Sequence, residues 1–155
     1  MSLESVRAFF AEKAPDISVI ESPLSSATVA LAAEAHGVEP GRIAKTLSLR
    51  IDERVVLIVA SGTSRMDNRK LKALFGGRPK MLGVGEVAEI TGHEVGGVCP
   101  FGLRTPLPVY CDLSLQGFDE VVPAAGSTHS AVRIAPARMA ELVEAEWVDV
   151  CQEPP

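Results

Sequence analysis

Hydrophobic residues repeat with two different periods along the first half of the chain. Between residues 3 and 13 they recur every three or four positions, the period of an amphipathic helix, and Ser2 is a suitable N-cap. An alanine-rich helix is expected from Ser25 or Ser26 to His36. Hydrophobic and polar residues alternate over 44–51, and VVLIVA at 55–60 is apolar throughout. We therefore expect a β-hairpin whose second strand is buried on both faces.

The rest of the chain predicts short elements separated by glycine and proline. Asp67 is the expected N-cap of a helix that turns Leu71, Leu74 and Phe75 inward. A last helix is expected over 136–144. A short helix is expected at 86–91, and short strands at 17–21, 80–82, 93–98, 107–111, 119–123, 131–135 and 147–151. Together these elements predict one α+β domain over residues 1–155, with a mixed, mostly antiparallel sheet.

Composition narrows the class of protein. The 155 residues are 46% hydrophobic and 23% charged, as in an ordinary globular chain, and no apolar run reaches 18 residues, so no membrane is expected as a partner. The N-terminus carries acids and no basic stretch, unlike a secretory signal. Three cysteines without a C-x-x-C pair favour a reduced, cytoplasmic location over a disulfide framework. Three scattered histidines indicate no zinc site, and no phosphate-binding glycine motif occurs.

The charge distribution changes the meaning of the net charge of −5. A chain with this net charge is not expected to coat DNA or RNA indiscriminately. The segment 42–80, however, holds ten basic and three acidic residues, a sum of +7, while 1–41 sums to −4 and 81–155 to −8. The middle segment therefore predicts either a basic face for one polyanion or a solvated surface neutralised by nearby acids. If the first alternative holds, its ten bases should share a face with the Gly96–Pro100 loop.

Lys45 is the first candidate for chemistry. It lies in the predicted strand 44–51, on the phase opposite to Thr46. A lysine in this phase either extends to the rim of the sheet or supplies a fixed cation at a pocket mouth, suited to a phosphate or a polarised carbonyl.

Two loops are poor in large side chains. In Gly92–Gly102, five of eleven residues are glycine or proline, which predicts either a tight turn or exposed backbone N–H groups for an oxyanion. The loop 124–130 (AAGSTHS) suits the lining of a small pocket, with His129 as a possible general base or an ordinary loop histidine. Cys99 lies between Val98 and Pro100, a setting typical of a packed small hydrophobe.

The ordered set of these features resembles the YbaK/prolyl-tRNA synthetase-associated editing domains. The resemblance extends over about residues 5–145 and includes Lys45-Thr46, which matches the strand lysine and following hydroxyl residue of that family. It also includes GGVCP at 96–100, which matches the family's G-x-x-x-P loop, and FDEVVPAAGS at 118–127. The resemblance implies a sheet curved into a partial barrel with helices outside.

The resemblance also implies an activity: hydrolysis of the ester of a mischarged aminoacyl-tRNA, chiefly tRNA for proline. It implies no metal, no cofactor and no covalent intermediate, and it assigns catalysis to Lys45, Gly96 and Gly97. Water, or the thiol of a substrate cysteine, would attack the ester, which is chemically reasonable because an aminoacyl ester is already activated. A prolyl-tRNA synthetase is a further expected partner. Residues expected to bind the substrate are Thr46, Val98, Cys99, Pro100, Gly126, Ser127 and His129.

The cleared amino acid is expected to be small, either alanine or cysteine. His129 is similar to a pocket histidine of the alanine-clearing subgroup, whereas Cys99 departs from the G-G-[IV]-S-P loop of the cysteine-clearing subgroup. Charge alone, without a family motif, assigns the tRNA backbone to Arg69, Lys70, Lys72 and Arg78. The alternatives are a non-catalytic module that binds tRNA or a synthetase, and a protein that acts on another small ligand or acyl ester.

Overall fold

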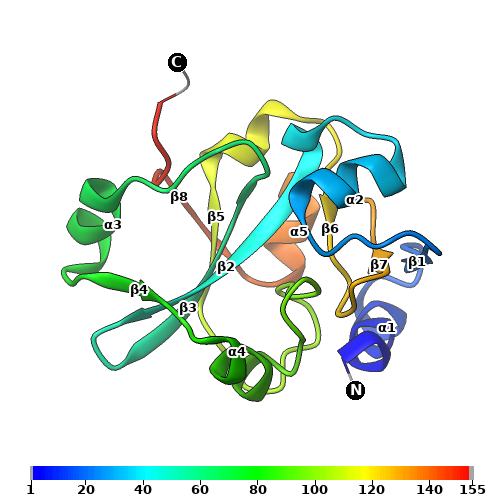
Figure 1. The fold of residues 1–155 in the computed structure, drawn as a ribbon, viewed down its shortest axis with the longest axis horizontal. Coiled ribbons are helices and arrows are strands. Elements are labelled where there is room, and N and C mark those ends of the chain that lie inside the picture. Colours follow the sequence, from blue (N-terminus) through cyan, green and yellow to red (C-terminus); the bar gives the residue numbers. More distant parts are fainter. Residues whose placement is uncertain (1, 154–155) are drawn as a thin grey trace.

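A computed structural model, which describes residues 2–153, contains a six-stranded mixed sheet flanked by helices (Figure 1). The strand order is β4-β2-β3-β5-β8, and β6 pairs with β2 beside this path; the large sheet is open rather than closed into a barrel. The predicted α+β class with a mixed sheet is confirmed. The six strands are β2 (Ile43–Ile51), β3 (Arg54–Ser61), β4 (Pro79–Met81), β5 (Val109–Asp112), β6 (Val122–Pro123) and β8 (Glu146–Val148).

The helices and the second, smaller sheet surround this framework. The two strands β1 and β7 pair antiparallel near α1, and β7 lies beside β6, where the Val132 N–H bonds the Pro123 carbonyl at 3.1 Å. None of the helices within residues 2–153 is long and apolar enough to cross a bilayer. The remaining elements are α1 (Ser2–Lys13), β1 (Ile20–Glu21), α2 (Val29–His36), η1 (Pro40–Arg42), α3 (Asn68–Phe75), α4 (Val84–Thr91), η2 (Leu113–Gly117), β7 (Ser130–Ala131) and α5 (Pro136–Leu142).

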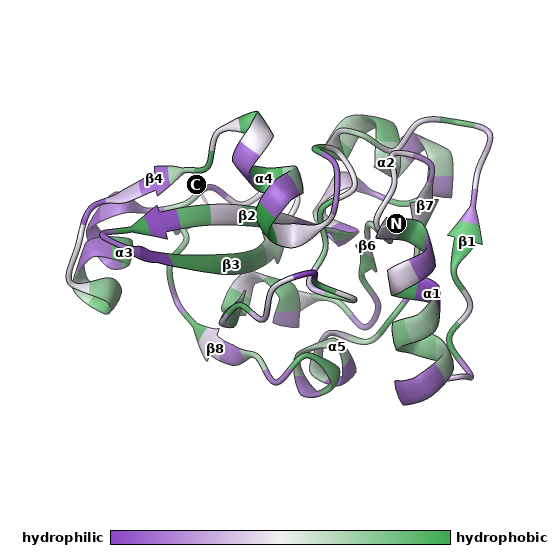
Figure 2. Ribbon diagram, turned by 90° about the horizontal axis from the view of Figure 1, so that it is seen from below, coloured by the Kyte–Doolittle hydropathy of each residue, from purple (hydrophilic) through white to green (hydrophobic). Residues whose placement is uncertain are grey.

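The β2–β3 hairpin is the centre of the fold. Its antiparallel register runs from Ala44↔Ser61 to Ile51↔Arg54. Because successive side chains of a strand face opposite ways, Leu57 and Val59 enter one core while Val56 and Ile58 enter another. β3 is accordingly hydrophobic along most of its length (Figure 2), and the prediction of a strand buried on both faces is confirmed.

The two cores have different partners. The core around Leu57 also receives Phe10 of α1 and Met139 of α5. The core around Ile58 receives Leu71 of α3 and the segment after β8. The helix α3 therefore packs on the opposite face of the sheet from α1 and α5.

Several expected elements are wrong in detail. Residues 93–98 form no strand, because a turn in which the Gly97 N–H bonds the Glu94 carbonyl at 2.9 Å, with Gly96 at φ +93°, interrupts the extended backbone. The N-cap of α2 is Thr28, whose side chain accepts a hydrogen bond from the Leu31 N–H, rather than Ser25 or Ser26. In α3, Asp67 is the N-cap as predicted, but Leu74 is exposed.

Asp112 joins the end of β5 to the chain beyond β8. It is buried, and its two carboxylate oxygens accept hydrogen bonds from the N–H groups of Val150 (2.8 Å) and Ser114 (2.9 Å). Burial by itself would raise the pKa of Asp112, but these hydrogen bonds outweigh it and hold the pKa below its usual value.

We expect Asp112→Ala to lower the free energy of unfolding at pH 7 by about 3 kcal/mol, because two buried N–H groups lose a charged acceptor. Since the folded pKa is depressed, this stabilisation is present above pH ~4 and is lost as the pH falls further. Urea unfolding at pH 7 and pH 3 measures both effects. Asp149→Ala, which removes an exposed carboxylate, is the control and should change stability by less than about 1 kcal/mol. Equal losses in the two variants would contradict this account.

Candidate active site

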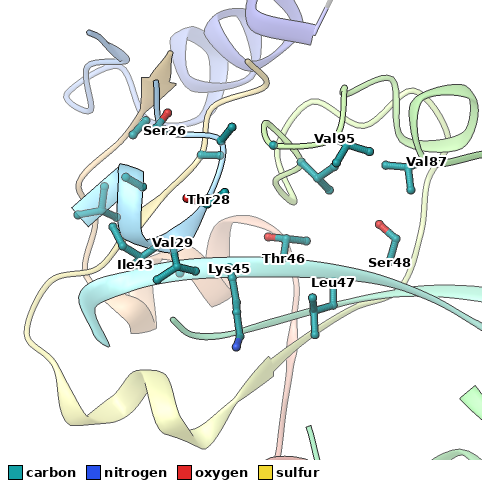
Figure 3. Close-up of a pocket in the computed structure, with 18 of the residues that line it drawn as sticks. Ser26, Thr28, Val29, Ile43, Lys45, Thr46, Leu47, Ser48, Val87 and Val95 are labelled. Carbon is teal, nitrogen blue, oxygen red and sulfur yellow. The ribbon is translucent and has the colours of Figure 1, made fainter. Parts of the chain in front are cut away.

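A cavity of about 330 Å³ opens along the outer edge of β2, between α2 and α4 (Figure 3). Two short strands share this edge: β6 pairs with Ile43 and Ala44, and β4 pairs with Leu49–Ile51. Between them no strand pairs with β2. The walls are mostly apolar and comprise Ser26, Ala27, Thr28, Val29, Ala32, Ile43, Ala44, Lys45, Thr46, Leu47, Ser48, Met81, Leu82, Val84, Val87, Val95, Gly96, Val98, Val122, Ala124, Ser130 and Ala131.

Thr46 presents its main chain to this gap. The Ser48 carbonyl accepts a hydrogen bond from the Leu82 N–H at 3.1 Å, so the main-chain groups of Ser48 face the outer edge. Because these groups alternate between the two edges of a strand, those of Thr46 also face outward. Within residues 2–153 they have no hydrogen-bond partner. The Thr46 hydroxyl is also buried without a partner, and its side chain points to the cavity side (Figure 3).

Among the residues of 2–153 that line the cavity, Lys45 alone is ionisable, and its ammonium points away from the cavity (Figure 3). No Asp, Glu, His or Cys lines it, whereas five hydroxyl residues do: Ser26, Thr28, Thr46, Ser48 and Ser130. Within residues 2–153 no group of three or more His, Cys, Asp or Glu is placed to hold a metal ion. The wall therefore offers hydrogen bonds and apolar contacts, and it lacks a side chain with the ordinary properties of a general base.

The Lys45 side chain leaves β2 on the other side from Thr46 and Ser48 (Figure 3). Its ammonium donates hydrogen bonds to the carbonyls of Ser64 and, at 3.4 Å, Gly62, in the loop after β3. Lys45 is thus among the residues that line the cavity, as expected, but its ammonium points to the other side of β2 (Figure 3), and its action as a cation on a substrate stays a prediction. Burial lowers the pKa of Lys45, and the nearby Arg65 lowers it further. No carboxylate within residues 2–153 forms an ion pair with it.

In the loop 96–98, successive residues face in opposite directions, toward the cavity and away from it. Gly96 and Val98 line the cavity, and their N–H groups have no partner within residues 2–153. Gly97 faces the other way: its N–H bonds Glu94, and its carbonyl accepts a hydrogen bond from the Gly126 N–H at 3.0 Å. The expectation that both glycines offer free amides is thus wrong for Gly97, which instead joins the two loops.

Cys99 and Pro100 were expected to contact the substrate, but both are buried and neither lines the cavity. Cys99 is fully buried in the core with Phe101. Burial raises the pKa of the Cys99 thiol to about 12, which keeps it protonated near neutral pH. Pro100 is buried and does not line the cavity.

The loop 124–130 reaches the cavity through Ala124 and Ser130 only. Ser127 forms a hydroxyl–hydroxyl hydrogen bond of 2.6 Å with Ser130 and so lies one contact behind the wall. Gly126 is buried and packs against the backbone of Ser2. His129 is exposed, bonds the Thr128 hydroxyl at 2.9 Å and does not line the cavity, so its expected position in the pocket is wrong.

The basic residues of segment 42–80 do not gather around the cavity. Arg69, Lys70 and Lys72 belong to α3, which packs through Leu71 against Leu49 on the face of the sheet opposite to Thr46. Arg78 is exposed directly before β4. The expectation that the ten bases share the face of the Gly96–Pro100 loop is wrong.

Acidic residues that lie close in space form ion pairs with several of these basic residues. Arg42 pairs with Asp119 at 2.6 Å, and Arg50 pairs with Glu86 of α4. Lys70 binds Asp149 and Glu153 near the C-terminus. In β4, Lys80 lies opposite Arg50, is exposed and has no ion-pair partner within residues 2–153, and the next residue, Met81, lines the cavity.

Sequence reasoning did not select Ser48 or Ser130 as wall residues, although the sequence held a partial indication of each. Ser48 shares the polar phase of β2 with Thr46, and Ser130 lies in the small-residue loop. The contribution of α2, through Thr28, Val29 and Ala32, had no such signal, because an alanine-rich helix gives no indication of which face covers a cavity.

Comparison with known proteins places this geometry in a family. Residues 25–142 match the model of the aminoacyl-tRNA editing domain. The chain belongs to this family. It is 47% identical over 155 residues, 99% of each chain, to the uncharacterized protein YwhH of Bacillus subtilis. It is 28% identical to EbsC of Enterococcus faecalis, for which Cys-tRNA(Pro)/Cys-tRNA(Cys) deacylation has been suggested, over 84% of this chain and 79% of that one.

A solved structure extends the comparison to three dimensions. The crystal structure of a proposed trans-editing enzyme for prolyl-tRNA synthetase superposes with a TM-score of 0.91, at 34% identity and with 98% of each chain covered. The resemblance to editing domains is thus confirmed for sequence and fold.

Gly97 provides a test of how the two loops are held together. A Cβ at this position would lie 2.6 Å from the Ser127 nitrogen, so we expect Gly97→Ala to push the loops apart and lower the thermal midpoint by several degrees. Gly85→Ala is a matched control, because a Cβ there would meet nothing within 4 Å. The Gly126 amide, whose hydrogen bond to Gly97 would break, should exchange faster only in Gly97→Ala. Similar midpoints for the two variants would contradict the contact.

Proposed function

We propose that this chain hydrolyses the ester bond of mischarged aminoacyl-tRNA, with the amino acid bound in the cavity at β2. The observation that carries this proposal is the cavity itself: a small, mostly apolar chamber with unpartnered main-chain groups, in a chain of the aminoacyl-tRNA editing family. Its volume of about 330 Å³ suits an aminoacyl group with a small side chain and the ribose that carries it.

The chemistry requires no nucleophilic side chain. A water oxygen attacks the ester carbonyl carbon, the bond to the ribose oxygen breaks, and the water's proton passes to that oxygen, which yields a free amino acid and a tRNA with its hydroxyl restored. The unpartnered N–H groups of Gly96 and Val98 are suitable donors for the oxyanion that develops during attack. The hydroxyls of Ser48 and Ser130 are suitable for orienting the water.

The proposed substrate is tRNA for proline carrying alanine or cysteine. The similarity to a proposed prolyl-tRNA synthetase trans-editing enzyme and to EbsC supports this class. The exposed position of His129 removes the residue that favoured alanine, while the apolar wall accepts either methyl or thiol. A second sieve of this kind is useful because a synthetase pocket cannot strongly reject a smaller amino acid. Prolyl-tRNA synthetase is the proposed partner.

A panel of charged tRNAs tests the proposal. We expect hydrolysis of Ala- or Cys-tRNA for proline well above the uncatalysed rate, with slower hydrolysis of the same tRNA carrying proline. Release of labelled amino acid over time, with tRNA alone as the control, measures the rate. The proposal is overturned if the protein hydrolyses none of the alanyl, cysteinyl, seryl and threonyl esters.

Lys45 is proposed as a positioning residue. Its hydrogen bonds to Gly62 and Ser64 fix β2 at the residue that precedes Thr46, so their loss would shift the main chain that faces the cavity. We expect Lys45→Ala to lower kcat about tenfold or more with little change in KM, and Lys45→Arg to recover part of the loss. The kcat-against-KM split, measured beside the thermal midpoint, separates this role from simple instability. Full kcat in Lys45→Ala would overturn it.

The charge distribution predicts which basic residue meets the tRNA. We expect Lys80→Glu to reduce the slope of log(kcat/KM) against log[salt] by about 1, because Lys80 is exposed and lies next to Met81, which lines the cavity. The Arg69→Glu/Lys72→Glu variant should leave kcat/KM within about twofold, since α3 lies on the opposite face. Deacylation between 50 and 200 mM salt measures both. A larger effect of Arg69→Glu/Lys72→Glu than of Lys80→Glu would instead indicate that α3 contacts the tRNA.

A second candidate function is a non-catalytic module that holds an aminoacylated tRNA end. The observation in its favour is the lack of an acidic, imidazole or thiol side chain in the cavity wall. This module would protect the ester instead of cleaving it. The same panel distinguishes the two, because protection slows hydrolysis below that of tRNA alone.

A further inference from the structure

The gap in the edge of β2 lies where a continued β4 ladder would place a further strand residue. The register of β4 on β2 pairs Leu49 with Met81 and Arg50 with Lys80. If this ladder continued, Thr46 would face residue 84. Instead the chain turns into α4 at Val84, whose side chain is 74% exposed, and the position opposite Thr46 is left to the cavity.

Thr46 therefore offers one complete and unused ladder position. In an antiparallel pair, a residue that faces its partner in this way exchanges two hydrogen bonds with it, one from each N–H to the opposite carbonyl. Neither main-chain group of Thr46 has such a partner within residues 2–153. Thr46 is half-buried, and unpaired main-chain groups at a strand edge away from bulk solvent are costly unless water or a ligand satisfies them.

An aminoacyl ester carries the groups that this position lacks. Its α-amino nitrogen and its carbonyl oxygen are attached to one Cα, as the N–H and C=O of a strand residue are. We propose that the aminoacyl group binds as an added strand residue opposite Thr46. Its ammonium donates to the Thr46 carbonyl, and its ester carbonyl accepts from the Thr46 N–H. This binding mode rests on the proposed function and adds Thr46 to its catalytic residues.

The binding mode accounts for three further properties of the site. Side chains directly opposite each other in a ladder lie on the same face, so an L-amino acid directs its side chain beside Thr46 into the apolar cavity. The Thr46 carbonyl supplies an acceptor for the ammonium in a wall without carboxylates. The Thr46 N–H remains bonded to the ester oxygen as negative charge develops there, which is the requirement for an oxyanion donor.

Replacement of the Thr46 amide by an ester tests the main-chain contact directly. The α-hydroxy analogue of threonine at position 46 keeps the side chain and removes only the N–H. We expect kcat/KM for L-alanyl-tRNA to fall by roughly 100-fold, the loss typical of one oxyanion donor. The same replacement at Glu53, in the exposed β2–β3 turn, controls for the procedure and should leave the rate unchanged. Thermal midpoints of both variants identify a loss that is due to unfolding.

Substrate stereochemistry supplies an independent readout on the unmodified protein. With both main-chain hydrogen bonds in place, a D-alanyl ester directs its methyl group away from the cavity. We expect kcat/KM for D-alanyl-tRNA to be about tenfold or more below that for L-alanyl-tRNA, each relative to its uncatalysed hydrolysis.

The outcomes separate the binding mode from the activity. If the wild type hydrolyses no L-aminoacyl ester, the proposed function is overturned, and the binding mode with it. If it hydrolyses L- and D-alanyl esters equally, or if the folded position-46 variant keeps its rate, the binding mode alone is overturned and the deacylase remains.

Discussion

The division of one strand edge between two short strands is the constraint on which the site depends. β3 pairs with β2 along its whole length, so the inner edge of β2 is fully satisfied. On the outer edge, β6 and β4 take the two ends and leave the middle open. The helices α2 and α4 then cover the opening without filling it. The cavity is therefore a consequence of strand pairing, not of a hole between helices.

Much of the hairpin could be predicted from residue patterns. Alternation over 44–51 placed Thr46 and Ser48 on one face, and the apolar run after it required a strand between two cores. The same alternation directs the Lys45 ammonium away from the cavity, although Lys45 was the first residue considered as a candidate for chemistry. The open edge itself could not be predicted, because it depends on the register of β4 and β6, which are far away in the chain.

In the loops too, the local sequence predicted some features, while others depend on contacts between segments that are distant in the sequence. Glycine and proline at 92–102 predicted either a tight turn or exposed backbone N–H groups; Gly96 lines the cavity, whereas the position of Gly97 depends on its contact with residues 126–127. The +7 charge of segment 42–80 is correct as a sum. Of the two alternatives for this segment, the structure agrees with the solvated surface neutralised by nearby acids, because α3 packs on the far face and because acids distant in the sequence pair with Arg42, Arg50 and Lys70.

The absence of acidic, imidazole and thiol side chains from the cavity wall has a consequence for how such a site changes over evolutionary time. In a site built on a side-chain dyad, most substitutions near the substrate also endanger the reacting groups. In the proposed function, the polar groups assigned to the reacting ester include main-chain groups of Thr46, Gly96 and Val98, which survive any replacement of a side chain that preserves the strand and the loop. Under that proposal, selectivity can change through the size of the wall residues while the proposed reaction stays the same, so that one scaffold can be adapted to several different errors.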